Sequence, residues 1–191
     1  MGRPSVRPLI VDAGLRVFLR GGFTASSVQD ITEEAGVPKG SFYNHFDSKE
    51  ALGAEIVDLY AEGGDLRAAL KDKSRPPLER LQAHFAGLTE MYRAAEFTRG
   101  CLLGNFSAEV SESSPEIRER LAVLFERWTH ELEEAIAEAQ EREEIPAQTA
   151  AADLAAFLLD AYEGAILRSR VEKSSRAFER FETLAFGKIL R

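Results

Sequence analysis

Apolar residues recur every three or four positions along almost the whole chain, which is the spacing of a helix with one buried face. The clearest stripe runs from Ile117 to Ala139 and includes Leu121, Trp128 and Ile136. Segments that alternate apolar and polar residues between turn signals, as strands do, are nearly absent. The pattern therefore predicts an all-α fold.

Glycine, proline and capping residues divide this pattern into about nine helices. Gly21-Gly22 and Gly36-Val37-Pro38 separate the first three helices, and Ser74-Arg75-Pro76-Pro77 is the strongest later break. The predicted helices cover about residues 7–19, 27–35, 39–46, 48–70, 78–95, 100–110, 115–143, 150–171 and 175–190.

The second helix has recognisable signals at both ends. Ser26 and Ser27 are candidate N-caps, with Gln29 and Asp30 at the distance of a capping box. Gly36 ends the helix at a position that suits a positive φ angle, which glycine adopts without strain. Two short helices joined by a glycine-containing turn, with a third helix packed across them, predict a helix-turn-helix.

The third helix, at residues 39–46, combines an apolar back with a polar front. Phe42 and Phe46 lie one turn apart and predict the buried side. The other positions carry groups that hydrogen-bond to base edges and phosphates, as a recognition helix requires. For this segment alone, an ordinary solvated amphipathic helix is the alternative. The polar positions are Lys39, Ser41, Tyr43, Asn44 and His45.

Residues 7–52 resemble the DNA-binding domain of the TetR family of transcriptional regulators. The matching motifs are FTASSVQDI at residues 23–31, AGVPKGSFYNHF at residues 35–46 and KEAL at residues 49–52. The resemblance implies an N-terminal three-helix DNA-binding domain over residues 1–52. A C-terminal helical ligand-binding and dimerisation domain follows over residues 53–191, and the helix at about residues 48–70 connects the two.

The resemblance also implies roles for single residues of the first domain. The phosphate-contacting positions of the family correspond to Tyr43, His45 and Lys49. The positions that face the major groove correspond to Lys39, Gly40, Ser41 and Asn44, with Gln29 of the second helix expected beside them. Gly40 has no side chain, so DNA can approach the backbone closely.

Two further assignments stay open at this point. Ser27, like Thr24 and Ser26, either donates a hydrogen bond to a phosphate or only caps its helix. Arg3 and Arg7 either belong to an arm that lies along the DNA or to a disordered tail.

The second domain is expected to bind a small, at least partly apolar effector. It supplies aromatic walls and a few polar groups, the usual composition of a ligand site, although ordinary core packing is the alternative for each residue. The candidates are His84, Phe85, Leu88, Met91, Tyr92, Phe97, Cys101, Asn105, Trp128, Phe157 and Tyr162.

The last two predicted helices are expected to form the dimer interface, because the resemblance implies a four-helix bundle of two copies. On residues 150–171 the apolar face includes Leu154, Leu158 and Ala161, and Arg168 interrupts its continuation. The last helix presents Phe178, Phe181, Leu184, Ala185 and Ile189. An exposed surface of this kind is a liability in a monomer.

The net charge of −8 argues against a nucleic-acid partner when it is taken alone. Its distribution changes the conclusion, because residues 1–50 contain equal numbers of basic and acidic residues and all the excess acid lies in residues 51–191. A neutral DNA-binding module predicts few phosphate contacts per subunit and therefore a moderate salt dependence.

Other classes of function find little support in the sequence. There is no G-x-S-x-G motif, phosphate-binding loop or metal-ligand spacing, so we expect neither an enzyme nor a metal or other cofactor. The apolar stretch at residues 145–167 contains Asp153, Asp160 and Glu163, which argues against a membrane span. The lone Cys101 fits a reducing cytoplasm.

The sequence thus predicts a cytoplasmic, homodimeric repressor that a small molecule releases from palindromic double-stranded DNA. Two alternatives remain open. One is a regulator that senses oxidants or electrophiles through Cys101, for which an inert buried thiol is the simpler interpretation. The other is a dimeric interaction protein that has lost DNA binding.

Overall fold

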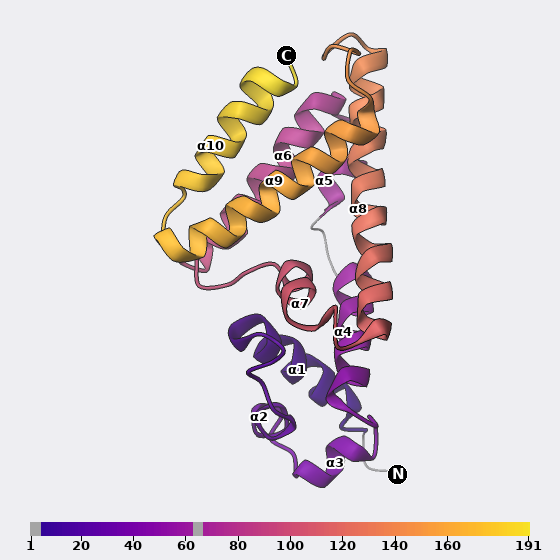
Figure 1. Ribbon diagram of the computed structural model, residues 1–191, viewed down its shortest axis with the longest axis vertical. Coiled ribbons are helices and arrows are strands. Elements are labelled where there is room, and N and C mark those ends of the chain that lie inside the picture. The colour runs from indigo at the N-terminus through magenta and orange to yellow at the C-terminus, as the bar shows by residue number, and fades with distance from the viewer. Residues whose placement is uncertain (1–4, 63–66) are drawn as a thin grey trace. The chain divides into compact units, whose positions relative to one another are not determined.

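The computed structural model describes residues 5–62 and 67–191, and every regular element within these ranges is helical (Figure 1). The all-α prediction is confirmed. The elements are α1 Arg7–Gly21, α2 Val28–Glu34, α3 Lys39–Tyr43, α4 Lys49–Glu62, α5 Ala68–Lys71, α6 Pro77–Ala94, α7 Leu102–Val110, α8 Pro115–Glu141, α9 Ala151–Glu172, α10 Arg176–Leu184 and the π-helix η2 Ala185–Ile189.

The chain packs as two compact units. The first comprises residues 1–63 and 101–123, which include α1–α4, α7 and the beginning of α8, and the second comprises residues 64–100 and 124–191. These units are defined by packing. They differ from the domain boundary predicted after residue 52, which separates a DNA-binding module from the rest of the chain by function. That boundary stays a prediction.

A shared apolar core joins the first four helices. Ile10 and Phe18 of α1, Ile31 of α2, Phe42 of α3 and Leu52 of α4 are all completely buried. Because each helix contributes its apolar stripe to this core, the opposite faces of α2 and α3 remain in solvent.

An aromatic cluster adds α7 to the same unit. The Phe106 ring of α7 packs edge-on against Phe18 and Phe23, with centroid distances of 5.4 and 5.2 Å. Phe23 lies in the turn between α1 and α2, so α7 directly contacts the segment that leads into the helix-turn-helix.

The predicted signals at both ends of α2 are confirmed. Ser27 is the N-cap, and its side chain and the Asp30 carboxylate form a capping box. Gly36 has a φ of +66°, in the left-handed region that glycine tolerates best. These features fix where α2 begins and where the chain turns into α3.

The second unit has an aromatic core to which α6, α8, α9 and α10 all contribute. Its members are largely or completely buried, and the rings touch one another across the four helices. They include Phe85 and Tyr92 of α6, Trp128 of α8, Tyr162 of α9, and Phe178 and Phe181 of α10.

A charged network fastens α5 and its neighbours to α8 in this unit. The Arg80 guanidinium is buried, donates to the Leu70 carbonyl oxygen at 2.9 Å and pairs with Glu138. Lys73 donates to the same Glu138 carboxylate at 2.8 Å. Lys73 and Arg80 together lower the pKa of Glu138 to about 2.

Three of the predicted helices end differently in the structure. The helix expected over residues 39–46 ends at Tyr43, because the amides of both His45 and Phe46 donate to the Phe42 carbonyl and close a tight turn. The helix expected over residues 48–70 ends at Glu62, and a separate short α5 follows. The last helix changes into the π-helix η2 after Leu184.

The two C-terminal helices run antiparallel and side by side, as Figure 1 shows for α9 and α10. Lys173, with a φ of +47°, is the left-handed C-cap that ends α9 before the chain reverses. The expected apolar faces are only partly exposed, since Leu154, Leu158 and Phe178 point into their own unit. These three residues therefore belong to the core rather than to an open face.

Candidate nucleic-acid interface and effector core

The outer face of α3 carries the expected polar side chains. Lys39, Gly40, Tyr43 and Asn44 are exposed, and Ser41 and the following His45 are half-buried. Behind them, Phe42 and Phe46 are buried with their ring centroids 5.5 Å apart. The structure therefore brings the recognition-helix candidates together on one solvent-facing surface.

Tyr43 is the largest exposed side chain of this surface. Its residue is 55% exposed, and its ring packs edge-on against Phe42 at a centroid distance of 5.3 Å. This contact restricts the ring, while more than half of the residue stays exposed. A hydroxyl in this position is able to donate a hydrogen bond to a phosphate oxygen without first being freed from the protein.

The two DNA-binding candidates at the start of α2, Ser27 and Gln29, already have hydrogen-bond partners within the chain. The Ser27 hydroxyl accepts from the Asp30 amide at 3.1 Å and donates to the Asp30 carboxylate at 2.7 Å. These bonds with the Ser27 hydroxyl and amide lower the pKa of Asp30. Gln29 is exposed and donates through Nε2 to Glu33 at 2.8 Å.

Of the two N-terminal arginines, the structure describes only Arg7. Arg3 lies outside the described residues. The Arg7 guanidinium forms a two-bond ion pair with Glu55 of α4, at 2.8 and 2.5 Å, and lies 4.9 Å from the centre of the Phe46 ring. Arg7 therefore connects α1 to α4 and to the residue that follows the turn after α3.

Lys49 is turned toward the protein. Its Nζ donates to the Phe23 and Ser26 carbonyl oxygens at 2.8 and 2.7 Å, and it lies 4.2 Å from the centre of the Phe23 ring. Burial lowers its pKa, while the nearby carboxylates of Glu50 and Glu109 act in the opposite direction. Glu109 was not predictable from the sequence, because no sequence motif connects α7 with the turn that it contacts.

Ion pairs connect α1 with α2. Glu34 accepts from Arg16 at 2.9 Å and from Arg20 at 3.2 Å, and these bonds lower its pKa. The pKa of Arg16 is raised, mainly by its bond to Glu34. Lys39 forms no ion pair with any residue that the structure describes, so its charge faces solvent.

Several effector candidates meet in the core of the second unit. Trp128 Nε1 donates to His84 Nε2 at 3.1 Å, and the His84 ring packs edge-on against Phe85. The Tyr162 hydroxyl lies 3.0 Å from Thr89 Oγ1 and donates to the Phe85 carbonyl oxygen at 3.3 Å. The sequence did not single out Thr89, because a lone threonine in a helix carries no recognisable signal.

The remaining effector candidates are distributed more widely. Leu88 and Tyr92 are buried in the second unit, whereas Met91 and Phe97 are half-buried. Phe157 is 51% exposed. Two candidates, the buried Cys101 and the half-buried Asn105, belong to the first unit.

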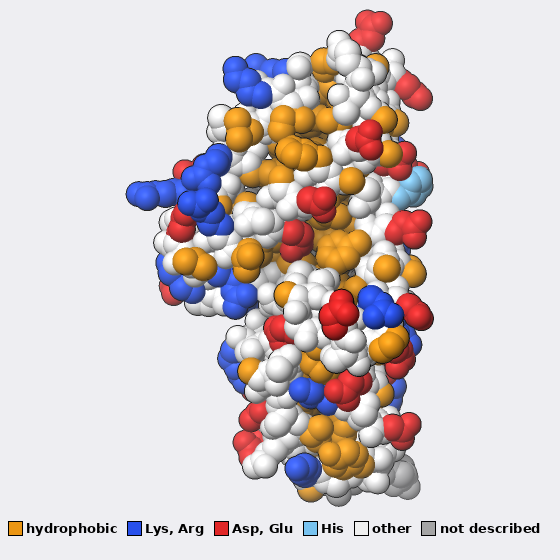
Figure 2. Space-filling model, in the orientation of Figure 1, with side chains coloured by type: hydrophobic (Ala, Val, Ile, Leu, Met, Phe, Trp, Pro, Cys, Tyr) orange, Lys and Arg blue, Asp and Glu red, His pale blue; other side chains and the backbone are white. Residues whose placement is uncertain are grey.

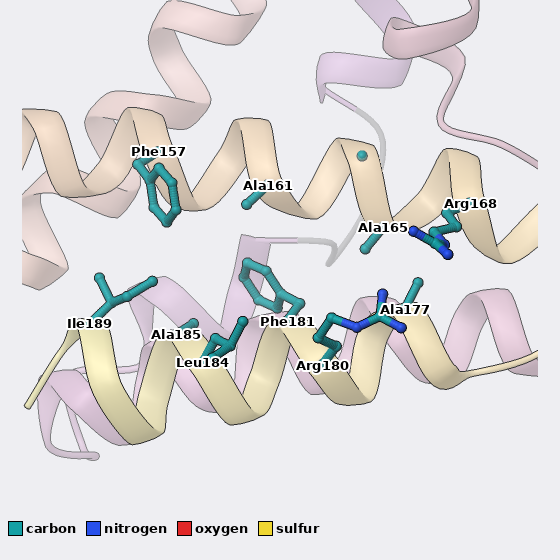
Figure 3. A pocket seen from close by; sticks show the side chains of 11 residues that line it. Phe157, Ala161, Ala165, Arg168, Ala177, Arg180, Phe181, Leu184, Ala185 and Ile189 are labelled. Carbon is teal, nitrogen blue, oxygen red and sulfur yellow. The ribbon is translucent and has the colours of Figure 1, made fainter.

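Phe157 instead lines an apolar groove between α9 and α10, which has a volume of about 230 Å³. Figure 3 shows that Phe157 and Ile189 lie near one end, with Arg168 and Arg180 near the other. Small side chains, among them Ala161, occupy the middle. In Figure 2, hydrophobic side chains gather over this part of the surface with basic side chains beside them.

Two kinds of feature are absent from the described ranges. None of their helices combines the length and hydropathy that a membrane crossing requires. No group of three or more His, Cys, Asp or Glu side chains in these ranges has the arrangement of a metal site.

Comparison with family models matches both parts of the chain. Residues 10–56 match the model of bacterial regulatory proteins of the tetR family. Residues 77–185 match the model of the tetracyclin repressor-like C-terminal domain.

Two curated proteins resemble the chain over most of their length. The HTH-type transcriptional repressor DhaR of Mycobacterium sp. (strain GP1) is 41% identical over 192 residues, which cover 100% of this chain and 95% of DhaR. The transcriptional regulator AcuR of Cereibacter sphaeroides is 32% identical, and the match covers 94% of this chain and 82% of AcuR.

Solved structures show the same arrangement of helices. The regulatory protein TetR from Rhodobacter sphaeroides has a TM-score of 0.89 at 29% identity, covering 95% of this chain and 97% of its own. The reduced form of E. coli NemR has a TM-score of 0.82 at 25% identity, covering 98% of both chains.

Proposed function

Because this chain belongs to the TetR family of DNA-binding transcriptional regulators, we propose that it is a homodimeric repressor that a small molecule releases from a palindromic operator. The main support is the polar outer face of α3 on its buried phenylalanine back. DhaR, which is 41% identical, is named as a repressor. The place of action is then the cytoplasm, where the operator DNA is found.

The residues of α3 and of the turn after it divide into two groups by their expected contacts with DNA. Tyr43 and His45 bind phosphate oxygens and fix the position of the helix, while Lys39, Ser41 and Asn44 reach base edges in the major groove. Gly40 is exposed, and a Cβ built on it meets no atom within 4 Å, so the duplex is able to approach the backbone there.

The contacts outside α3 are expected to be fewer. Gln29 joins the groove-facing group by exchanging its bond to Glu33 for a base edge. Ser27 is exposed, and it is expected to lie against a phosphate while it keeps its capping bonds to Asp30. Arg7 and Arg3 extend the contact along the backbone, with Arg7 leaving Glu55 to do so.

The groove between α9 and α10 is the proposed dimer surface. A two-fold axis through its centre places the bulky end of one copy, with Phe157 and Ile189, opposite the end of the other copy that contains Gly164, Arg168 and Arg180. The large ring then meets small residues and cationic side chains, which is a favourable pairing for an aromatic ring. The groove is thus complementary to itself.

A dimer carries two copies of α3, which read two half-sites. Successive major grooves on one side of B-DNA recur about every 34 Å, so the two helices fit only an operator with matching half-site spacing. A ligand that changes this separation weakens binding, provided that its affinity differs between the two arrangements.

The effector is proposed to bind in the core of the second unit near His84 and Tyr162. There the aromatic rings supply apolar contacts, while the His84–Trp128 and Thr89–Tyr162 pairs place polar atoms among them. A partly apolar molecule with one or two hydrogen-bonding groups suits this composition. Release by a ligand is favoured over sensing through Cys101, because that residue is only 2% exposed.

The direct test is selection of bound sequences from a random double-stranded pool, with wild type and Tyr43→Ala compared under identical low-salt conditions. We expect the wild type alone to enrich an inverted repeat. The enriched duplex then serves in a screen for small molecules that release it. A folded dimer that enriches no sequence at low salt contradicts the proposal and favours an interaction protein without DNA binding.

A further inference from the structure

Two charged side chains hold the turn between α1 and α2 from different helices. From the start of α4, Lys49 directs Nζ at the carbonyl oxygens of Phe23 and Ser26, at 2.8 and 2.7 Å, and over the Phe23 ring. An ammonium group has three N–H donors, and two of them bond to these carbonyl oxygens while the group lies over the Phe23 ring. A phosphate at this position would compete with contacts that the group already makes within the protein.

Glu109, near the end of α7, binds the same turn. Its Oε2 accepts from the Thr24 amide at 2.7 Å. A Cβ added to Gly22 would collide with Glu109 Oε1, so the carboxylate occupies space that only a glycine leaves free. Gly22 also has a φ of +82°, which other residues rarely adopt.

The clamped segment leads directly into α2. Ser26 is buried and donates to the Gly22 carbonyl oxygen at 2.6 Å, and the next residue, Ser27, is the N-cap of α2. The position of this turn therefore sets where α2 begins. Because α3 packs on α2, a shift of this turn also displaces the recognition surface on α3.

We propose that Lys49 and Glu109 are positioning residues for DNA binding, which clamp residues 22–26 between α4 and α7 and do not themselves contact the duplex. This rests on the proposed DNA-binding function. It assigns Lys49 a role other than the phosphate contact that the family resemblance implies. It also makes operator affinity depend on α7, which lies outside the helix-turn-helix.

The salt dependence of affinity separates positioning from phosphate contact. Each phosphate neutralised by a protein cation contributes about 0.9 to the slope of log K against log salt concentration, so loss of one contact per subunit lowers a dimer's slope by about 1.8. We expect Lys49→Met to reduce affinity for the selected operator at least about tenfold with an unchanged slope. Lys39→Met removes an exposed cation that is expected in the major groove, and it shows in the same assay how the slope responds when a positive charge close to the DNA is lost. A slope that falls by about 1.8 in Lys49→Met overturns the proposal.

Glu109 offers a test in which electrostatics and positioning predict opposite signs. Removing an acidic residue should strengthen binding to a polyanion if charge alone matters. We expect Glu109→Ala to bind the operator several-fold more weakly, because the Thr24 amide loses its acceptor. The matched control is Glu112→Ala, an equal charge change at an exposed residue three positions further along. Its affinity should equal or slightly exceed that of the wild type.

A second substitution at Glu109 and the binding of the wild type distinguish a loss of positioning from a loss of folding or of DNA binding altogether. If Glu109→Ala is not folded by circular dichroism, Glu109→Gln removes the charge and keeps an acceptor oxygen, and its affinity should stay close to that of the wild type. Equal or tighter binding by a folded Glu109→Ala overturns the positioning role. Failure of the wild type to bind any duplex contradicts the proposed function instead.

Discussion

At the scale of single residues, neighbours decide whether a polar group is available to DNA. The Tyr43 ring packs against Phe42 and the residue is 55% exposed, whereas the ammonium group of Lys49 in the same unit donates to two carbonyl oxygens. The family resemblance assigned both Tyr43 and Lys49 to phosphate-contacting positions. The structure distinguishes these two residues, because only Tyr43 is directed to solvent.

Removal of the Tyr43 hydroxyl should weaken operator binding without loss of the ring. A hydrogen bond to a charged group contributes about 1.5–3 kcal/mol, so Tyr43→Phe is expected to lower affinity at least about tenfold. Fluorescence anisotropy with the selected duplex measures this. The slope against salt should not change, since tyrosine is neutral. Unchanged affinity would remove Tyr43 from the phosphate-contacting group.

The polar front of α3 was predictable because helical periodicity alone places Phe42 and Phe46 on the opposite side. The partners of Arg7 and Lys49 were not predictable in the same way. Glu55 is far from Arg7 in the sequence, and the carbonyl groups that hold Lys49 belong to a turn whose path depends on packing. Long flexible side chains take directions that periodicity does not determine.

At the scale of elements, two nearby glycines should respond oppositely to the same substitution. Gly36 has a φ of +66°, so Gly36→Ala is strained and should cost about 1 kcal/mol in the free energy of unfolding. Gly40 lies within α3, where alanine should be neutral or stabilising by roughly 0.5 kcal/mol. Urea unfolding measures both. Equal effects of the two variants would contradict the assigned turn.

The contacts of α5 and α6 with α8 should depend on pH through Glu138. Lys73 and Arg80 lower its pKa to about 2 from an ordinary value of 4.5. The contribution to stability is therefore fully present above pH 4.5 and is lost as the pH falls toward 2. The melting temperatures of wild type and Glu138→Gln should differ at neutral pH and converge in acid. Glu126→Gln, at an exposed position of the same helix, should show no such trend.

Helix interiors were easier to predict than helix ends. The stripe from Ile117 to Ala139 is long, and α8 follows it closely. The prediction of one helix over residues 48–70 did not separate α4, which ends at Glu62, from α5, although Gly63-Gly64 is a break signal of the kind that separates the first two helices. The separate α5 is held by tertiary contacts such as the bond from Arg80 to the Leu70 carbonyl, which a local pattern does not reveal.

At the scale of the whole molecule, the proposed function requires two copies. The groove between α9 and α10 is apolar and exposed, so burying it against a second copy of the chain is favourable. The two-fold symmetry of such a dimer supplies two recognition helices. The sequence predicted this pairing through the family resemblance. It did not show which apolar side chains remain outside, since Leu158 and Phe178 carry the same signal as the exposed Phe157.

The dimer can be tested at a position where the isolated chain has room for a larger side chain. A Cβ at Gly164 of α9 meets no atom within 4 Å, so Gly164→Leu should leave the subunit folded while it obstructs a partner in the groove. Gly87→Leu is the matched control, because Gly87 also lies exposed on a helix and has the same free space. Sedimentation equilibrium should show a dimer that is at least about tenfold weaker only for Gly164→Leu, equivalent to about 1.4 kcal/mol. Operator affinity should fall in parallel, because a subunit that binds alone reads one half-site. An intact dimer in Gly164→Leu would place the interface on another surface.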